Sequence, residues 1–162
     1  YMTSRTSSLT AVDHATELLL TSNTAGSNGG AMFLNLGAEV AVESGALLAV
    51  KGNAAANAFG GGVYLQDEGT KLIATGRDTS MVIERNTAGS HGGGVIALNG
   101  ANVVVKNGSS LAIKANEAIS QSGGGVAFEG NGSTLSATGG GTRITIESNT
   151  AEVTSWRMAA SS

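Results

Sequence analysis

The side chains able to do acid-base chemistry are few in this sequence, and they are scattered. The 162 residues include 12 Asp and Glu, nine Lys and Arg, two His and no Cys. Carboxylates converging on one surface, with a Lys, an Arg or a calcium ion beside them, could act as general acids and bases on a sugar chain. The only aspartates lie in different parts of the sequence and mostly in predicted turns: Asp13, Asp67 and Asp78. We therefore predict no catalytic residue.

Metal and phosphate chemistry is not indicated either. The absence of cysteine excludes disulfides and thiolate metal sites. His14 and His91 lie in predicted corner segments and do not recur, so we expect solvated turn residues rather than metal ligands or bases. The sequence contains neither the Asp/Gly-rich nonapeptide of calcium-wound helices nor the GxxxxGK[ST] phosphate loop. We predict no metal and no cofactor.

One motif recurs along the whole chain and determines where the other residues must lie. An aliphatic residue is followed by Asn three positions later, by Ala two positions after that, and then by a glycine run. Successive asparagines are separated by 30, 33, 30 and 33 residues, so two units make 63, and the five are Asn23, Asn53, Asn86, Asn116 and Asn149. Self-similarity of this kind predicts a repeat array in which each unit contacts its neighbours.

Each unit contains three short segments in which apolar residues alternate with other residues. Gly, Asn or Ser bounds each segment, a pattern typical of strands and turns rather than helices. In the best-preserved unit the segments are GVIAL, NVVVK and SLAIK. A unit of about 31 residues would leave these strands half-exposed if it folded alone, so the units must stack strand on strand. We predict an all-β fold, a right-handed parallel β-helix with three strands per coil and roughly five coils.

The five asparagines are predicted to form a hydrogen-bonded row at one corner of the coil. Asn tolerates left-handed backbone angles, and its amide donates and accepts at once, so stacked copies can bond to one another. We expect replacement of Asn86 to cost more stability than replacement of Asn102, which we expect to be exposed. Two residues before the row, one outward position is charged in successive units and should form a weakly stabilising ladder of opposite charges: Lys51, Glu84, Lys114 and Glu147.

A second outward row is the predicted interaction surface. Phe33, Tyr64 and Ile96 hold equivalent places after the glycine corner, one position out of phase with the inward apolar residues. In-register strands about 5 Å apart would align them on one outer face. Such a row could bind another protein chain or serve as packing on the outside of the sheet. Trp156 stands where a corner glycine is expected, and it could cap the open core or contact a neighbouring segment.

The paired motifs resemble the repeats of the polymorphic outer membrane proteins, whose hallmarks are FxxN and GGA(I/L/V). The first motif appears here with an aliphatic residue in place of Phe: LTSN at Leu20, VKGN at Val50, IERN at Ile83, IKAN at Ile113 and IESN at Ile146. The second appears as GGAM at Gly29 and as GGGV in the runs containing Gly61, Gly92 and Gly123. The resemblance implies a β-helical passenger at the cell surface, with adhesion as the usual role.

Charge and composition bear on two further questions, whether the chain binds nucleic acid and whether it spans a membrane. The net charge is −3 without a basic block, so we expect no nucleic-acid partner. No apolar run approaches the roughly 20 residues of a membrane helix, so we predict no membrane-spanning segment. We expect residues 1–162 to form a single β-helix segment of a longer repeat array.

The predicted function is that of a structural or adhesive rod, extracellular or at the cell surface. It would present a surface or assemble into a filament or coat, because almost every position is used by the repeat. Its partners would be other protein chains or neighbouring segments of a larger assembly, with glycans as further candidates. The alternative is a carbohydrate-active β-helix enzyme, a polysaccharide lyase, hydrolase or epimerase, whose groove is not evident in the sequence.

Overall fold

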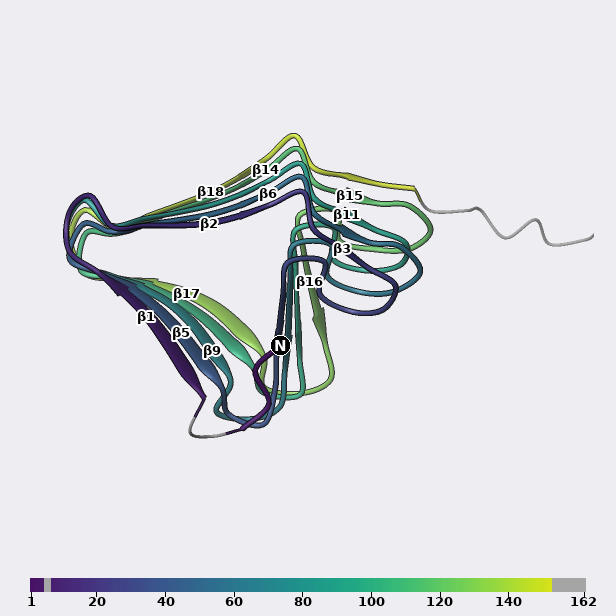
Figure 1. Ribbon diagram of the computed structural model, residues 1–162, viewed down its shortest axis with the longest axis horizontal. Helices are drawn as coiled ribbons and strands as arrows, with labels where there is room; N and C mark the ends of the chain where they lie inside the picture. Colours follow the sequence, from purple (N-terminus) through teal and green to yellow (C-terminus); the bar gives the residue numbers. More distant parts are fainter. Residues whose placement is uncertain (5–6, 153–162) are drawn as a thin grey trace, which may run out of the picture.

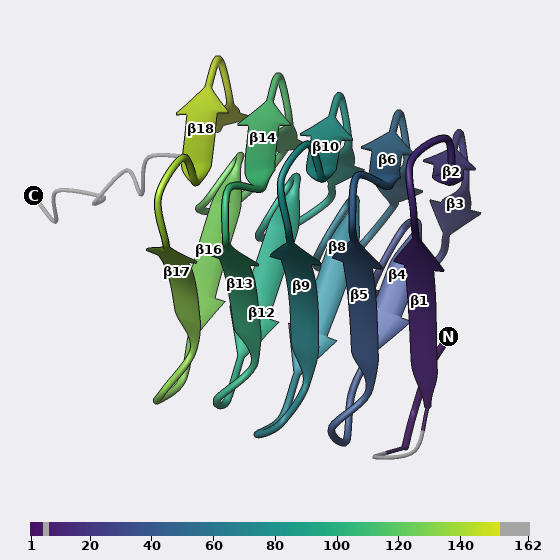
Figure 2. The same ribbon diagram turned by 90° about the vertical axis from the view of Figure 1, so that its left-hand side faces the viewer.

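The computed structural model describes residues 1–4 and 7–152. Among these residues the chain is all-β, with no helix. Its strands form a parallel β-solenoid of about five turns, spaced about 31 residues apart in sequence, which confirms the predicted fold class. Figure 1 shows a three-sided coil around a central core, and Figure 2 shows strands of successive coils lying side by side.

Three sheets form the long sides of the coil. The first contains β4 (Met32–Leu34), β8 (Val63–Gln66), β12 (Val95–Leu98) and β16 (Val126–Glu129). The second contains β1 (Ser8–Val12), β5 (Glu39–Glu43), β9 (Lys71–Thr75), β13 (Asn102–Lys106) and β17 (Thr134–Thr138). The third contains β2 (Glu17–Thr21), β6 (Leu47–Lys51), β10 (Ser80–Glu84), β14 (Ser110–Lys114) and β18 (Arg143–Glu147).

A fourth, short sheet follows the asparagine corner and was not predicted from the sequence. It contains β3 (Thr24–Ala25), β7 (Ala54–Ala55), β11 (Thr87–Ala88), β15 (Glu117–Ala118) and β19 (Thr150–Ala151). Every neighbouring pair of strands in the four sheets is parallel. Loops leave this short sheet and project away from the core before the chain returns to the first sheet (Figure 1).

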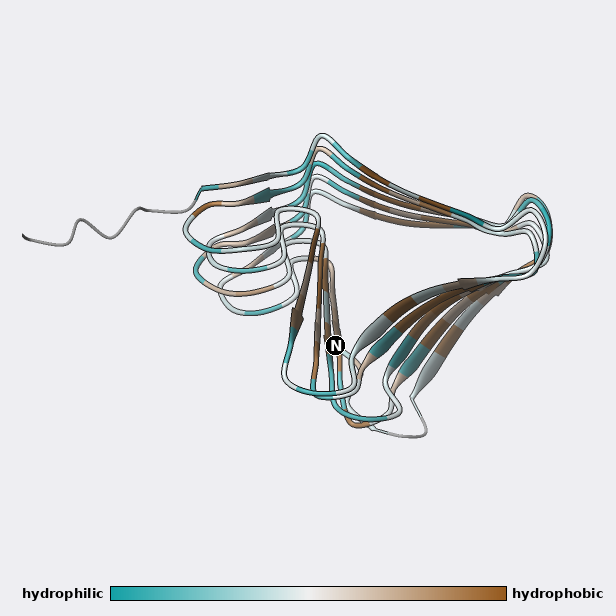
Figure 3. Cartoon of the chain, turned by 180° about the vertical axis from the view of Figure 1, so that it is seen from behind, coloured by the Kyte–Doolittle hydropathy of each residue, from teal (hydrophilic) through white to brown (hydrophobic). Residues whose placement is uncertain are grey.

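The core lies inside the three long sheets and is made of alternating side chains stacked from coil to coil. Hydrophobic residues alternate with other residues along the strands, whereas the corners and loops are mostly neutral or hydrophilic (Figure 3). This in-register alternation makes a one-residue slip costly, because a slip would turn the apolar set outward. The fully buried aliphatic side chains of the middle coils include Leu34, Val40, Val42, Leu48, Val50, Leu65, Leu72, Met81, Ile83, Val105, Leu111 and Ile113.

The two outermost described coils depart from this burial pattern. Leu9, Phe128 and Ile146 occupy inward positions, yet their side chains are 39%, 46% and 49% exposed. Each lies on a strand that pairs with only one neighbour among the described residues. Inward orientation therefore buries a side chain only where a coil stacks on both sides.

Alternating corner lengths account for the 63-residue double unit. The corner before β6 has three residues, Ser44 to Ala46, whereas the corner before β10 has four, Gly76 to Thr79. The next two copies of this corner repeat the alternation, with residues 107–109 and 139–142. The 33-residue spacing has one more residue than the 30-residue spacing at each of three places. These places are this corner, the corner after the first sheet and the projecting loop.

Candidate functional site

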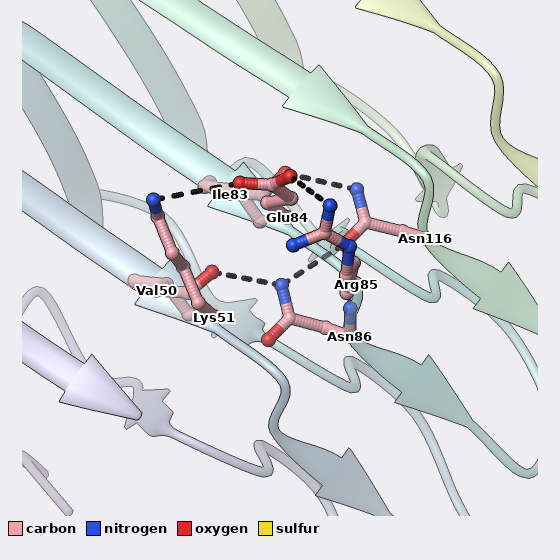
Figure 4. Close-up of polar contacts among 7 residues, drawn as sticks. All are labelled: Val50, Lys51, Ile83, Glu84, Arg85, Asn86 and Asn116. Atoms are coloured by element: carbon pink, nitrogen blue, oxygen red, sulfur yellow. Dashed lines mark hydrogen bonds and ion pairs between the residues drawn. The ribbon is translucent and has the colours of Figure 1, made fainter. Parts of the chain in front are cut away.

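The asparagine row is a continuous hydrogen-bonded column through the five coils. Asn86 Oδ1 accepts from the backbone N and from Nδ2 of Asn53, both at 2.9 Å. In turn the backbone N and Nδ2 of Asn86 donate to Asn116 Oδ1, also at 2.9 Å. The second Nδ2 proton of Asn86 goes to the carbonyl oxygen of Val50, 3.0 Å away (Figure 4). The amide thereby uses both donors and both acceptor positions.

The same bonding is repeated along the column. Asn23 donates to Asn53, and Asn116 donates to Asn149, with every distance at 2.9 Å. Asn53, Asn86 and Asn116 are at most 1% exposed. A buried amide with any unmet donor or acceptor would be destabilising, so full pairing is what allows these side chains to lie inside the fold. The hydrogen bonds of the column therefore join neighbouring coils to one another.

The glycine runs are needed because neighbouring coils approach closely beside this column. A β-carbon on Gly94 would lie 2.5 Å from the carbonyl oxygen of Gly125 and 3.0 Å from Asn116 Nδ2. The first glycine of the run, Gly92, has a φ of 68°, a conformation that favours glycine. The runs therefore serve the corner in two ways, by a left-handed turn and by space for the next backbone.

The charged row lies in register as predicted, but it forms one ion pair between coils among the described residues. Glu84 is aligned with Lys51 on one side and with Lys114 on the other. Its carboxylate lies 3.4 Å from Lys51 Nζ and 3.2 Å from Arg85 Nη2, which follows it in sequence (Figure 4). Glu84 is thus shared between a cross-coil and a local cation, and the ladder of opposite charges is incomplete.

The row at Phe33, Tyr64 and Ile96 is not exposed as an interaction surface would be, and it is packing on the outside of the sheet, the other alternative that the sequence left open. The three residues are aligned on neighbouring strands of the first sheet, as expected. However, Ile96 is fully buried, Tyr64 is 5% exposed and Phe33 is half-buried. They form a second, smaller apolar cluster outside the main core, together with Phe59, Leu98 and Ala127.

The projecting loops cover this row. A β-carbon on Gly92 would lie 2.7 Å from the β-carbon of Ile96, so the loop backbone packs directly on that side chain. Tyr1, Phe33 and Tyr64 stack with ring centroids 4.3 Å and 4.8 Å apart. Of the predicted interaction residues, Trp156 lies outside the described residues.

Tyr64 keeps a neutral hydroxyl in this cluster. Burial raises the pKa of Tyr64 above its ordinary value of 10.0, with a smaller contribution from the nearby carboxylate of Asp67. The hydroxyl donates to Gln66 Oε1 at 2.7 Å. Tyr64 is therefore a packed and hydrogen-bonded residue of the outer cluster rather than a free contact residue.

Among the described residues, the closest approach of an acidic and a basic side chain between coils is at His91. Its Nδ1 lies 3.3 Å from Glu129 Oε1, and its ring lies 5.4 Å from the ring of Phe59. The expectation that His91 is a solvated turn residue was wrong, since its side chain is 25% exposed and contacts both neighbours. His91 and Glu129 line a shallow hollow of about 360 Å³ that also includes the exposed Phe128. His14, in contrast, is exposed in its corner.

The remaining acidic residues do not converge. Asp13, Asp67 and Asp78 lie in three separate corners, each with a positive φ between 62° and 77°. Within residues 1–4 and 7–152, no group of three or more His, Cys, Asp or Glu side chains could hold a metal ion. These aspartates serve as turn residues, since Asp is one of the few side chains that tolerate this conformation.

Comparison with known proteins leaves the chain without an assigned relative. No family model, no curated protein and no solved structure matches it. The described part of the chain contains no helix that is long and apolar enough to cross a membrane.

Proposed function

We propose that this chain is a structural or adhesive β-helical rod that acts outside the cell or at its surface. The observation that carries the proposal is the asparagine column, which joins all five coils through paired amide bonds. A rod built in this way holds its outer faces at fixed spacings of about 4.8 Å per coil. Such regular spacing suits presentation of a surface or lateral assembly.

The proposed location and adhesive role rest on the motifs. The paired FxxN-like and GGA-like sequences resemble the polymorphic outer membrane proteins, and such repeats support a passenger at the cell surface. In the described residues the recurring Asn and Gly of the two motifs lie in corners, where Asn86 bonds to its copies and Gly94 allows close approach. The motifs therefore have a structural explanation whether or not the chain is adhesive.

Adhesion is tested by attaching the folded chain to beads and measuring detachment force from three surfaces. The surfaces carry epithelial cells, immobilised polysaccharide or a second copy of the chain, and beads carrying serum albumin provide the baseline. We expect retention above this baseline on at least one surface. Circular dichroism and sedimentation of the same preparation establish that the rod is folded and report its assembly. Baseline retention on all three surfaces, combined with a monomer in sedimentation, would overturn the proposal.

A second candidate function is carbohydrate chemistry at the hollow beside His91. The specific observation favouring it is the 3.3 Å approach of His91 Nδ1 to Glu129 Oε1 next to the exposed ring of Phe128. A carboxylate that contacts one nitrogen of a His can orient the ring, so that the other nitrogen could transfer a proton to or from a bound substrate, as general acid-base chemistry requires.

Incubation with acidic and neutral polysaccharides separates the two candidates. Turnover that is lost in Glu129→Gln and in His91→Ala, but kept in the control Glu147→Gln, would establish an enzyme and remove the structural proposal. Glu147 is an exposed glutamate on a different sheet, so its replacement controls for a change of surface charge. Under our proposal none of the proteins cleaves any of the substrates.

A further inference from the structure

The chain contains four Asn-Gly dipeptides, and one of them differs from the others in the hydrogen bonding of its glycine N–H. They are Asn28-Gly29, Asn99-Gly100, Asn107-Gly108 and Asn131-Gly132. In such a pair the backbone nitrogen of glycine can attack the side-chain carbonyl carbon of asparagine, because glycine has no side chain to obstruct the approach. All four pairs lie in corners or loops, so sequence alone does not distinguish them.

Stacking of the coils occupies the attacking nitrogen in three of the pairs. Gly29 N donates to the carbonyl oxygen of Phe59 at 3.0 Å. Gly100 N donates to Ser133 Oγ at 3.1 Å, and Gly108 N donates to Thr142 Oγ1 at 3.0 Å. Each acceptor belongs to the next coil, so each bond forms only when that coil is in place.

For Gly100 and Gly108 this protection follows from the alternation of corner types. Gly100 and Gly108 lie in three-residue corners, and the hydroxyl comes from the last residue of the four-residue corner stacked on them. The same pairing joins Gly37 N to Thr70 Oγ1 at 2.9 Å and Gly45 N to Thr79 Oγ1 at 2.8 Å. The hydroxyl of a long corner thus caps the glycine N–H of a short corner.

Asn131-Gly132 lies in a long corner, where this rule offers no protection. Gly132 N has no hydrogen-bond partner among the described residues, and the Asn131 side chain is exposed. The equivalent glycine of an earlier long corner, Gly69, is likewise unbonded in the described chain, but it follows Glu68, which cannot lose ammonia. Asn99 and Asn107 differ further, since both have a left-handed φ of 52° and 57°.

We propose that Asn131 is a site of spontaneous deamidation, and that coil stacking protects the other three pairs. Hydroxide removes the Gly132 amide proton, and the nitrogen attacks Asn131 Cγ. The new N–Cγ bond forms, the Cγ–Nδ2 bond breaks, and ammonia leaves with a proton from water. Water then hydrolyses either carbonyl–nitrogen bond of the succinimide, giving aspartate or isoaspartate. The net reaction consumes one water and releases one ammonia.

The product changes the charge and the backbone of an exposed corner. Asn131 lines a shallow hollow of about 360 Å³ with Glu68, Asn99 and Gly132. Deamidation adds a negative charge to this hollow, and the isoaspartate form adds a methylene to the backbone. The chain would therefore acquire an age-dependent mark at one corner while its asparagine column stays intact.

The test is peptide mass spectrometry of the folded chain after incubation at mildly alkaline pH. We expect Asn131 to gain the mass of deamidation about tenfold faster than Asn28, Asn99 or Asn107, the factor that one hydrogen bond supplies. In urea the four rates should converge, because the coils no longer stack. Equal rates in the folded chain would overturn the proposal.

Two variants remove one protecting hydroxyl each. Ser133→Ala should accelerate deamidation of Asn99 alone, and Thr142→Val should accelerate deamidation of Asn107 alone, each by about tenfold. Each variant serves as the control for the other, and circular dichroism establishes that both remain folded. If either variant unfolds, Asn28 is also accelerated, and the comparison of Asn131 with the other sites in the parent chain decides the proposal. Unchanged rates at Asn99 and Asn107 in folded variants would contradict the protective role of the hydroxyls.

Discussion

The asparagine corner is the same in every coil, whereas the other corners alternate between two forms. At the asparagine corner, Asn86 accepts from Asn53 and donates to Asn116 through one amide group. At the alternating corner, the N–H of Gly45 in a three-residue corner donates to the hydroxyl of Thr79 in the four-residue corner of the next coil. The first corner joins identical residues by hydrogen bonds, whereas the second joins two different residues.

This difference explains why the sequence has both a short and a long period. A self-complementary amide can repeat at every coil, and substitution at one position breaks bonds to both neighbours. A glycine N–H needs an acceptor of another kind, which a corner one residue longer provides, so the two forms alternate and the full period becomes 63 residues. Bonding at these two corners therefore accounts for two of the three extra residues in the longer spacing, and the third lies in the projecting loop.

Breaking the uniform corner should have the largest effect on stability. Asn86→Leu would remove the acceptor of two Asn53 donors, the side-chain donor to the Val50 carbonyl and one of the two donors to Asn116 Oδ1, whose bond from the backbone N of residue 86 remains. Most of these groups are buried, so we expect the free energy of unfolding to fall by about 3 kcal/mol. Urea unfolding followed by circular dichroism measures the change.

The matched control is Asn57→Leu, because Asn57 is exposed and has no hydrogen bond among the described residues. Asn102, which the sequence suggested as an exposed control, is half-buried and was wrongly assigned. Its Nδ2 donates to the Gly100 carbonyl at 2.8 Å, and its Oδ1 accepts from Thr134 Oγ1 at 2.5 Å. A loss at position 86 no larger than the loss at position 57 would show that the column does not stabilise the stack.

Crowding the same corner should have the next largest effect. Gly94→Ala places a β-carbon 2.5 Å from the Gly125 carbonyl oxygen, so the backbones must separate, at a cost of about 2 kcal/mol. Gly140→Ala is the control, since no atom lies within 4 Å of the added carbon and Gly140 has no positive φ. The control should change stability by less than about 0.5 kcal/mol. Thermal unfolding of both variants checks the contrast, and equal melting temperatures would refute close approach as the reason for the glycine run.

Removing the hydroxyl at an alternating corner should have a smaller effect. Thr79→Val leaves the Gly45 N–H without its acceptor and removes the hydroxyl that donates to the Thr75 carbonyl, so two neutral hydrogen bonds are lost at a cost of about 1.5 kcal/mol. Thr79→Ser keeps the oxygen and should recover most of the loss in urea unfolding. If Ser destabilises the chain as much as Val does, the methyl group and not the hydroxyl is what the buried corner requires.

The charged row should contribute least. Glu84→Gln removes the ion pairs to Lys51 and Arg85, and we expect a loss of about 0.5 kcal/mol at low salt. Glu147→Gln, which has no ion pair among the described residues, is the control. Unfolding in about 1 M salt should abolish the difference between the two variants, since salt screens surface charges. A difference that persists at high salt would mean that Glu84 acts through packing or hydrogen bonding.

The outer cluster shows where sequence reasoning failed. Alternation correctly placed Phe33, Tyr64 and Ile96 on the outer side of one sheet, but it cannot show what lies over that side. The loop before β12 folds back so that Gly92 packs on Ile96. Both positions recur along the chain, but a recurring spacing does not show that one packs on the other. His91 was misjudged for a different reason, because its partner Glu129 lies in the next coil at a position where the other units have no acidic residue.

The sequence by itself determined the parallel solenoid, the register of its strands and the inward apolar set, because each follows from a spacing that recurs along the chain. It also determined that the five asparagines lie in one column, since residues at the same position of successive repeat units lie one above another. The tertiary structure decided the rest: the direction of the amide bonds, the pairing of Gly45 with Thr79, the burial of Ile96 and the exposure of Asn131. These features depend on which atoms of neighbouring coils come into contact. The spacing of the repeat shows only which residues lie next to one another in the stack.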